Sequence, residues 1–252
     1  MFAQERHNAI KRIVSKQRRI NFSDLQRLVK VSPATLRRDL TELEIAGDIV
    51  RVHGGVLDRS YLRSEISFDE RLLRNSSAKK AIAAAAAAMV PPGASVLVDA
   101  GSSCLEAGRA LLGRKDVRII THSVGLVEAG LRGEAEVLCI GGSLRKVSGA
   151  LTGGAALGAL DRIKADIAFI GASGLDPGEG CSTTEASEAE MKKVMLARAT
   201  QKILLADHTK WGHPSTIRFA DWNDFDAWIT DKKPGQAEMD YLAASGVKVT
   251  IA

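Results

Sequence analysis

The chain has 252 residues, of which 45% are hydrophobic and 26% are charged. That balance is ordinary for a globular protein, and the length leaves room for one large domain or two smaller ones. The net charge of +5 is unevenly placed, because residues 1–60 hold twelve Lys and Arg against seven Asp and Glu, whereas the remainder holds 23 of each sign. Positive charge confined to the first quarter predicts a module that binds a polyanion, joined to a neutral partner domain.

The sequence argues against secreted and membrane-spanning classes of protein. Cys104, Cys139 and Cys181 are too few and too widely spaced for a disulfide framework or a CxxC metal pair, so we expect a cytoplasmic protein. The first residues are charged and precede no apolar stretch, so no signal peptide is expected. The longest apolar run, residues 81–90, is mostly alanine and too short to cross a bilayer. It predicts a helix packed closely against a neighbour, and no membrane partner is expected.

The first sixty residues predict three helices followed by a hairpin. Apolar positions recur with helical spacing in residues 5–17 and 22–29, and a third helix follows from Pro33. Residues 48–58 carry valine and isoleucine on both sides of Gly54–Gly55, which predicts two strands with these glycines as their turn. Three helices and a basic hairpin are typical of a winged helix-turn-helix domain, in which the second helix of the pair enters the DNA major groove.

The helix that begins at Pro33 has one apolar face and one cationic face. Ser32 is a good N-cap, and proline suits the first helical position because its missing N–H would be unbonded there anyway. Leucines recur at spacings of four and three, while the opposite face presents Arg37 and Arg38. Such a pair of arginines is compatible with a solvated helix face and with a helix that contacts guanine edges or phosphates. The residues of this helix alone leave both interpretations open.

A longer stretch resolves this choice through a resemblance. VSPATLRRDLTELEIAGDIVRVHGGV, residues 31–56, resembles the signature of the DeoR family of bacterial transcriptional regulators, from the T-x-R-R-D-L core to the R-x-H-G-G wing. The resemblance implies that the arginine face reads DNA and that the wing contacts the backbone or the minor groove. It leaves open whether Arg18, Arg19 and Lys30 contact DNA or only add solubilising charge. The implied DNA-binding residues are Ser32, Thr35, Arg37 and Arg38 on the helix, with Arg51 and His53 on the wing.

From about residue 75 the pattern changes to short apolar runs that alternate with amphipathic segments. This alternation predicts an α/β domain, with a mostly parallel sheet covered by helices on both faces. The expected domains are residues 1–58 and 76–252, with a linker at 59–75. The expected strands are residues 95–101, 117–123, 135–142, 165–172, 202–208 and 226–231. The expected helices between them lie near residues 103–112, 124–132, 155–163 and 185–199.

Polar residues follow several of the expected strands. In such a fold, ligands bind at the carboxyl ends of the strands. Asp99 precedes a Gly-Ser-Ser turn whose backbone N–H groups, hydroxyls and helix N-terminus suit an anion. The segments 121–123 and 141–142 and the pair Asp207 and Lys210 follow other strands. From these residues alone, a pocket for a phosphorylated, hydroxyl-rich small molecule and a purely structural role remain alternatives.

Motifs along this part of the chain resemble the effector domain of the same family, which is related to sugar-phosphate isomerases and aminosugar-phosphate deaminases. They include R-S-E-x-S-F-x-x-R (63–71), D-A-G-S-S (99–103), D-x-A-F-I-G-A (166–172) and L-A-D-x-x-K (205–210). The resemblance implies that Gly101, Ser102 and Ser103 hold a phosphate, that Lys192 and Lys210 supply charge, and that Asp99 and Ser123 meet hydroxyls. Thr121, Gly141 and Gly142 complete the implied effector site.

The sequence departs from the family pattern at this site. Serines stand at 102 and 103 where threonines are common, and His122 stands where asparagine is common. The serines keep the hydroxyls, whereas the histidine changes the pattern of hydrogen-bond donors. No metal is expected, because His208 and His213 beside Asp207 lack a third ligand at suitable spacing.

The leading interpretation is a regulator, most simply a repressor of a carbohydrate-utilisation operon, that binds double-stranded operator DNA and responds to a phosphorylated sugar or polyol. It is expected to have no enzymatic activity and no cofactor, and to form a homodimer or tetramer. The alternative is a sugar-phosphate isomerase or aminosugar-phosphate deaminase with an accessory DNA-binding module. Four carboxylates are conceivable general bases for it, although none stands in a catalytic motif. They are Asp99, Asp166, Asp176 and Glu188.

Overall fold

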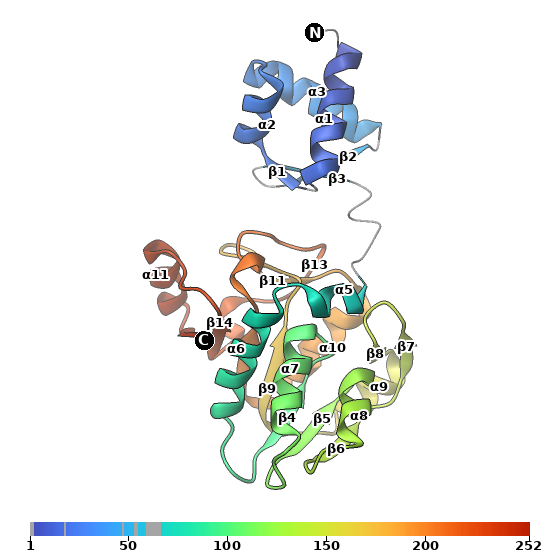
Figure 1. Cartoon of the computed structure of the whole chain (residues 1–252), viewed down its shortest axis with the longest axis vertical. Helices are drawn as coiled ribbons and strands as arrows, with labels where there is room; N and C mark the ends of the chain where they lie inside the picture. The colour runs from blue at the N-terminus through green and yellow to red at the C-terminus, as the bar shows by residue number, and fades with distance from the viewer. Residues whose placement is uncertain (1–2, 18, 47, 53–54, 59–66) are drawn as a thin grey trace. The chain divides into compact units, whose positions relative to one another are not determined.

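A computed structural model of the chain describes residues 3–17, 19–46, 48–52, 55–58 and 67–252 (Figure 1). The chain divides into two compact units, Met1–Glu65 and Ile66–Ala252. We call them the N-terminal unit and the C-terminal unit, and each is built around hydrophobic clusters of its own.

The N-terminal unit has the predicted winged helix-turn-helix architecture. Ile10, Val14, Leu25, Leu36 and Leu40 form the centre of its core. A small antiparallel sheet in the order β1-β3-β2 closes the fold, and its first strand is too short to be seen in the sequence pattern. The elements are α1 (Ala3–Gln17), β1 (Arg19–Asn21), α2 (Phe22–Val29), α3 (Pro33–Ile45), β2 (Ile49–Val52) and β3 (Gly55–Asp58).

The wing differs from the predicted hairpin at its turn. Val52 pairs with Gly55, so Gly55 begins β3 and is not part of the turn, and residues 53–54 lie between the strands, outside the described residues. A Cβ atom at position 55 would lie 2.5 Å from the carbonyl oxygen of Ile20. Glycine is therefore required here because β1 approaches the backbone of β3, and the prediction of a Gly54–Gly55 turn was wrong.

The expected linker at 59–75 is partly helical. Helix α5 (Phe68–Leu73) lies within it and belongs to the C-terminal unit. Ser67 caps this helix, because its hydroxyl accepts a hydrogen bond from the Glu70 N–H at 3.3 Å. The chain divides between residues 65 and 66, so the compact C-terminal unit includes residues 66–75, ahead of the expected start of the second domain at residue 76.

The C-terminal unit contains a seven-stranded sheet in the order β15-β14-β12-β9-β4-β5-β6, and every pairing in it is parallel. All six strands predicted from the sequence are present. The seventh, β15, is a short and largely exposed edge strand that carries no continuous apolar run. The strands are β4 (Ser95–Val98), β5 (Arg118–Thr121), β6 (Glu136–Cys139), β9 (Ala165–Gly171), β12 (Ala199–Leu205), β14 (Ala227–Thr230) and β15 (Lys248–Ile251).

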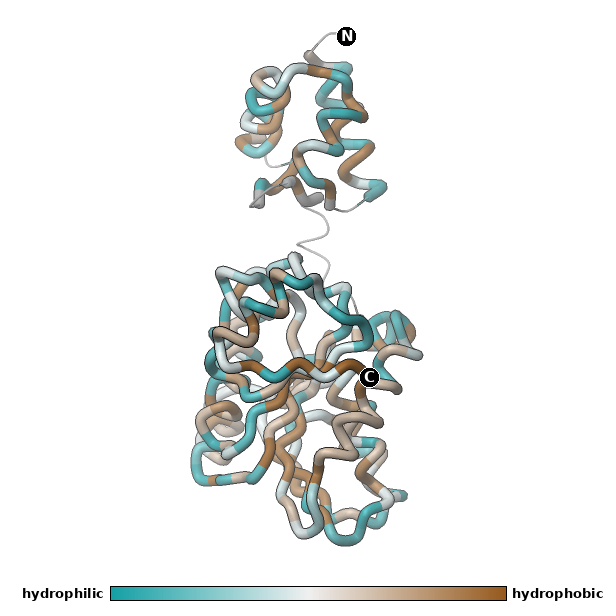
Figure 2. The backbone as a smooth tube through the Cα atoms, turned by 90° about the vertical axis from the view of Figure 1, so that its left-hand side faces the viewer, coloured by the Kyte–Doolittle hydropathy of each residue, from teal (hydrophilic) through white to brown (hydrophobic). Residues whose placement is uncertain are grey.

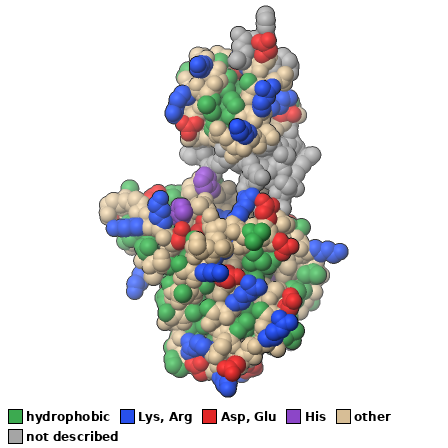
Figure 3. Space-filling view, viewed as in Figure 1, with side chains coloured by type: hydrophobic (Ala, Val, Ile, Leu, Met, Phe, Trp, Pro, Cys, Tyr) green, Lys and Arg blue, Asp and Glu red, His purple; other side chains and the backbone are tan. Residues whose placement is uncertain are grey.

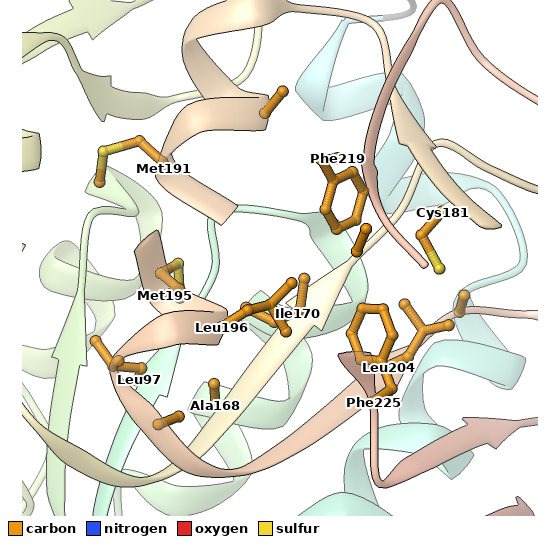
Figure 4. Close-up of a cluster of buried hydrophobic side chains, with 14 of the residues drawn as sticks. Leu97, Ala168, Ile170, Cys181, Met191, Met195, Leu196, Leu204, Phe219 and Phe225 are labelled. Atoms are coloured by element: carbon orange, nitrogen blue, oxygen red, sulfur yellow. The ribbon is translucent and has the colours of Figure 1, made fainter. Parts of the chain in front are cut away.

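Both faces of the sheet are buried along its central strands, whose successive side chains point to opposite sides. In β4, Val96 and Val98 belong to the cluster under one layer of helices, whereas Leu97 belongs to the cluster under the other. In Figure 4, Leu196 of the second layer lies beside Ile170, and Met191 and Met195 of the same helix belong to the same cluster. Figure 2 shows hydrophobic stretches through the interior of this unit. The first layer is α6 (Ser76–Ala88), α7 (Ser102–Leu111) and α8 (Val124–Gly130), and the second includes α9 (Gly154–Leu160) and α10 (Ala186–Ala197).

The alanine-rich run is part of α6, as predicted, with Ala83 and Ala86 buried against α7. Small additional elements surround the main sheet, and the strands and turns among them are too short to be predicted from sequence periodicity. They are the hairpin β7 (Ser143–Arg145) and β8 (Ala150–Thr152), the small sheet of β10 (Gly174–Asp176), β11 (Gly180–Thr183) and β13 (Ile217–Ala220), the 3-10 turns η1 (His208–Lys210) and η2 (Trp222–Asp224), and α11 (Gln236–Ala244).

Within the described ranges, no helix has both the length and the apolar character that crossing a membrane requires.

Candidate DNA-binding face and effector site

Helix α3 begins where the sequence predicts, because Ser32 and Pro33 form its start. The Ser32 hydroxyl accepts a hydrogen bond from the Thr35 N–H at 3.1 Å and lies 2.8 Å from the Thr35 hydroxyl. Leu36, Leu40 and Leu43 are buried on the inner face. Ser32 and Thr35 thus serve first as the helix cap, and their hydroxyls already have partners.

The outer face of α3 presents the two predicted arginines to solvent. The side chain of Arg38 is 84% exposed, and its Nε lies 3.3 Å from Glu42 in a surface ion pair of the kind that contributes little to stability. The guanidinium of Arg37 lies 5.5 Å from the centre of the Phe22 ring, within cation–π range. Figure 3 shows Lys and Arg side chains on the side of this unit that faces the viewer. Both guanidinium groups are accessible to a polyanion.

The wing residue Arg51 lies against the same face of α3. Its Nη1 donates to the Thr41 hydroxyl at 3.2 Å, and its backbone N–H donates to Glu44 Oε1 at 3.3 Å. These contacts bring the wing strand β2 beside the arginine face. The other predicted wing residue, His53, lies outside the described residues, as does Arg18.

Asp39 is an important residue of this unit that sequence reasoning missed. It is buried between α1 and α3, where Arg6 donates to both of its oxygens at 2.9 and 3.0 Å and His7 Nε2 lies 3.2 Å from it. The hydrogen bonds from Arg6 outweigh the effect of burial and lower the pKa of Asp39. The available signal was its spacing, which puts it in phase with the buried leucines. Asp39 fastens α3 to α1.

In the C-terminal unit, the candidate effector site lies where the direction of strand order reverses. The chain leaves β4 toward β5 and β6 on one side and returns to β9 on the other side. In parallel sheets the carboxyl ends of two such strands border the crevice that binds ligands. Asp99 follows β4, and its N–H donates to Phe169 of β9 at 3.0 Å, while the Gly171 N–H donates to Asp99 Oδ2 at 2.9 Å.

The floor of this crevice is a buried network of charged residues. Lys192 Nζ from α10 donates to Asp99 Oδ2 at 2.5 Å and to the Gly171 carbonyl at 3.0 Å, and His122 Nε2 lies 3.2 Å from Asp99 Oδ1. Burial alone would raise the pKa of Asp99, but the charge of Lys192 and the contact with His122 hold it far below its usual value. Burial alone would lower the pKa of Lys192, and the charge of Asp99 raises it instead.

This network changes the expected roles of two residues. The charge of Lys192 is already matched by Asp99, so Lys192 is not a free cation at the site. Asp99 is 2% exposed and its two oxygens already have partners. The pair therefore supports the backbone of residues 99–101 and 171 rather than offering an open donor and acceptor to a ligand.

Gly101, Ser102 and Ser103 form the start of α7, as predicted. Gly101 is the N-cap and makes no side-chain cap, and all three residues are half-buried. The N–H groups of a first helical turn lack partners within the helix, and they attract anions.

A cluster of cations lies at the end of strand β12, and we call it the cationic cluster: Lys79, Lys210, Arg71 and Arg74. Lys79 is buried, and its Nζ donates to the carbonyl oxygens of Arg71 and Arg74. Burial lowers the pKa of Lys79, and Lys210 and Arg71 add to this effect although Asp207 opposes it. Burial likewise lowers the pKa of Lys210, with Arg71 and Arg74 adding to it. Only Lys210 had been assigned a role from the sequence.

Asp207 shapes this end of the site. Its Oδ1 accepts hydrogen bonds from the Thr209 N–H at 3.0 Å and from the Asn75 side chain at 3.2 Å. These contacts fix the turn η1, which carries Lys210. Since β9 lies between β4 and β12, the strand ends before α7 and η1 are about 10 Å apart.

The remaining predicted effector residues lie farther along the sheet or within its structure. The Thr121 hydroxyl donates to the Val98 carbonyl at 2.7 Å and accepts from the Ser123 N–H at 3.1 Å, and Ser123 caps α8. Both are buried. Gly141 and Gly142 are exposed after β6, and Gly142 has a φ of 147° with a hypothetical Cβ only 2.6 Å from the Thr152 carbonyl.

His208, the histidine next to Asp207, pairs with another carboxylate. His208 Nδ1 lies 2.9 Å from Asp231, and its N–H donates to the same carboxylate at 2.8 Å. Among the residues whose placement is described, no group of three His, Cys, Asp or Glu side chains could hold a metal ion.

Comparisons with known proteins agree with both units. Residues 6–59 match the DeoR-like helix-turn-helix domain, and residues 74–232 match the DeoR C terminal sensor domain. The HTH-type transcriptional regulator GolR of Listeria innocua is 32% identical over 256 residues that cover 100% of both chains. The HTH-type transcriptional repressor GlcR of Bacillus subtilis is 32% identical over 100% of this chain and 97% of its own.

More distant proteins also match. The glycerol-3-phosphate regulon repressor of Escherichia coli is 26% identical over 98% of each chain. Among solved structures, ribose 5-phosphate isomerase A of Methanocaldococcus jannaschii is 19% identical and gives a TM-score of 0.41 over 54% of this chain and 55% of that one. The two domain matches and the full-length relatives show that this chain belongs to the DeoR family of helix-turn-helix transcriptional regulators.

Proposed function

We propose that the protein represses a carbohydrate-utilisation operon and that a phosphorylated sugar or polyol, bound in the C-terminal unit, controls its affinity for operator DNA. Its place of action is then the cytoplasm, where the operator is. The observation that carries the proposal is the cationic cluster beside the open N-terminus of α7, at the carboxyl edge of the sheet. The names of the relatives GlcR and the glycerol-3-phosphate regulon repressor support it.

The phosphate end of the effector fits the cationic cluster. Lys79 and Lys210 both have lowered pKa values, because burial and the neighbouring arginines disfavour their charged forms. A phosphate dianion placed among these groups would offset that repulsion. It would accept charge-assisted hydrogen bonds, which are shorter and stronger than neutral ones.

The start of α7 supplies the second part of the site. A strand end about 10 Å from η1 is within reach of a single sugar phosphate, so one ligand can contact both places. The backbone N–H groups and the hydroxyls of Ser102 and Ser103 then bind its oxygen atoms.

DNA binding is assigned to α3 and the wing. Arg37 and Arg38 are exposed on the outer face of the helix, and Arg51 lies beside it on β2. One such unit reads only a few base pairs, so useful specificity requires at least two copies on repeated half-sites. We therefore propose a homodimer or tetramer that joins through the C-terminal unit.

The surroundings of the conceivable general bases favour a regulator without enzymatic activity. Asp99 is held by Lys192. Asp166 is bonded to Ser95 at the amino end of the sheet, opposite the crevice. Asp176 accepts two backbone N–H groups of its own turn, and Glu188 pairs with Arg145 at 3.1 Å. None of these four carboxylates stands free beside the proposed phosphate site.

The test is a binding screen with two readouts. Three phosphates (glycerol 3-phosphate, glucose 6-phosphate and fructose 1-phosphate), each with its unphosphorylated counterpart and with inorganic phosphate as a control, are added to the protein and to its complex with operator DNA. We expect one phosphate to raise the melting temperature of the protein and to lower its operator affinity, and we expect the unphosphorylated counterpart to do neither. A protein that binds operator but responds to none of these phosphates would contradict control by this ligand class.

A further inference from the structure

The hairpin formed by β7 and β8 contacts both the candidate effector site and helix α5. It packs beside α9 and α10 and is not part of the main sheet. Residues distant in the sequence contact the hairpin along both of its strands and at its tip.

His122 joins strand β8 of the hairpin to the floor of the effector site. It is 1% exposed, its Nδ1 lies 3.1 Å from the Leu151 carbonyl, and its Nε2 lies 3.2 Å from Asp99 Oδ1 and 3.3 Å from the Ala100 N–H. Because a carbonyl oxygen can only accept a hydrogen bond, Nδ1 donates to Leu151 whether Nε2 bonds to Asp99 or to Ala100. The main chain adds a second connection, since the Leu151 N–H donates to the His122 carbonyl at 2.8 Å.

Arg145 connects the other strand of the hairpin to the same floor. Its Nη1 lies 3.1 Å from Glu188 of α10. Glu188 is one helical turn from Lys192, whose ammonium group holds Asp99. Both strands of the hairpin are therefore linked to Asp99, one through His122 and one through α10.

The tip of the hairpin holds the start of α5. The Phe68 N–H donates to the Val147 carbonyl at 3.0 Å, and Phe68 is the first residue of α5. An N–H group in the first turn of a helix has no partner within that helix, so this hydrogen bond fixes the position of the helix start. In the chain, α5 follows directly on the segment that leads from the DNA-binding unit.

We infer that the β7–β8 hairpin transmits occupancy of the effector site to α5, with His122 as the positioning residue that couples Asp99 to the hairpin. The inference rests on the proposed function and names the regulation of that same site. A ligand bound at the start of α7 contacts the residues that follow Asp99. A shift of the Asp99 carboxylate caused by the ligand moves the imidazole of His122, then strand β8, and then the main chain of Phe68.

A matched pair of substitutions isolates the hydrogen bond at the tip. Phe68→Pro removes the N–H, whereas Phe68→Ala keeps it, and both lose the aromatic ring. Proline suits the first helical position, and the preceding Ser67 has a φ of −55° and a ψ of 155°, which are allowed before proline. The difference between the two variants is therefore the hydrogen bond to Val147.

The probe is whichever of glycerol 3-phosphate, glucose 6-phosphate and fructose 1-phosphate shifts operator affinity of the wild-type protein most, used at saturation. Coupled sites commonly change each other's affinity by about 5–150-fold. We expect Phe68→Ala to keep most of the wild-type ratio of operator affinities measured without and with the probe. Phe68→Pro should reduce that ratio to about two-fold or less. Both variants should bind operator normally without the probe. Equal ratios in the two variants would overturn the inference.

A second comparison addresses His122. In His122→Ala, the probe should still change tryptophan fluorescence at saturation, but it should no longer change operator affinity. His122→Gln, which supplies an amide donor in place of the imidazole, should recover part of the change in operator affinity. A purely structural role for His122 would instead lower the melting temperature without changing the ratio of operator affinities. Failure of all three phosphates to bind the wild-type protein would refute the proposed function, whereas a normal response in Phe68→Pro refutes this inference alone.

Discussion

Lys192 Nζ lies 2.5 Å from Asp99 Oδ2, and both side chains are buried at the point where the strand order of the sheet reverses. Asp99 comes from the end of β4 and Lys192 from α10, 93 residues later. A buried ion pair of this kind is costly to break, because the remaining charge has neither water nor a partner.

We therefore expect Lys192→Met to destabilise the C-terminal unit by about 3–5 kcal/mol, and the double variant Asp99→Asn/Lys192→Met to recover much of that loss. Urea unfolding followed by tryptophan fluorescence measures it, since Trp211, Trp222 and Trp228 pack together with ring centres 5.3–5.8 Å apart in this unit. A single variant that unfolds at the wild-type urea concentration would show that the pair contributes nothing net.

The second prediction concerns acid stability of the N-terminal unit. The folded-state pKa of Asp39 is lowered by its hydrogen bonds with Arg6, so its contribution to stability is present above its unfolded pKa of about 4 and is lost as the pH falls through the lower folded value. The difference in urea midpoint between the wild type and Asp39→Asn should be largest near neutral pH and shrink below about pH 4. Far-ultraviolet circular dichroism includes the signal of this unit's helices, whereas tryptophan fluorescence reports only on the C-terminal unit, which holds all three tryptophans. A difference independent of pH would contradict the assignment.

The third prediction concerns operator binding. Arg37→Ala and Arg38→Ala should each reduce operator affinity by about 1–3 kcal/mol at fixed salt and leave the fold intact. Arg27→Ala is the matched control, since Arg27 is an exposed arginine of the same unit that pairs with Asp24 on α2. Fluorescence anisotropy with labelled operator gives the affinities. If both α3 variants bind as tightly as the control, this helix does not read the groove.

The fourth prediction concerns the phosphate site. Lys210→Ala should remove a charge-assisted hydrogen bond of about 1.5–3 kcal/mol and so weaken binding of the active sugar phosphate by about 10- to 150-fold. Ser102→Ala should weaken its binding less. Operator affinity without the phosphate should stay near the wild-type value. Lys115→Ala is the control, because Lys115 is 77% exposed and precedes the amino end of β5. A Lys210→Ala protein that responds at the wild-type phosphate concentration would place the pocket elsewhere.

The fifth prediction concerns assembly. Light scattering should give a dimer or tetramer at micromolar concentration, and the isolated C-terminal unit, residues 66–252, should retain that state. A monomer both with and without operator DNA would contradict the proposed arrangement of paired half-sites.

Local sequence patterns were sufficient to predict most of the architecture. The cap and leucine spacing of α3 and the six apolar strands are visible because helix and strand periodicity follow directly from backbone geometry. The motifs of residues 31–56 and 205–210 likewise identified the family that the domain comparisons show. Strands of three residues, such as β1, β7 and β8, have too few positions for a period to be recognised.

The roles of individual site residues were decided by tertiary structure. The sequence determined that Asp99, Lys192 and Lys210 are polar residues near strand ends or on a helix beside them, but not that Lys192 neutralises Asp99 while Lys210 joins Lys79 and two arginines. The same holds for Asp39, which is one acidic residue among several until α1 brings Arg6 against it. Whether a charge is free for a ligand or already matched depends on partners from distant parts of the chain. Only the packing of helices against the sheet and against one another brings those partners within hydrogen-bonding distance.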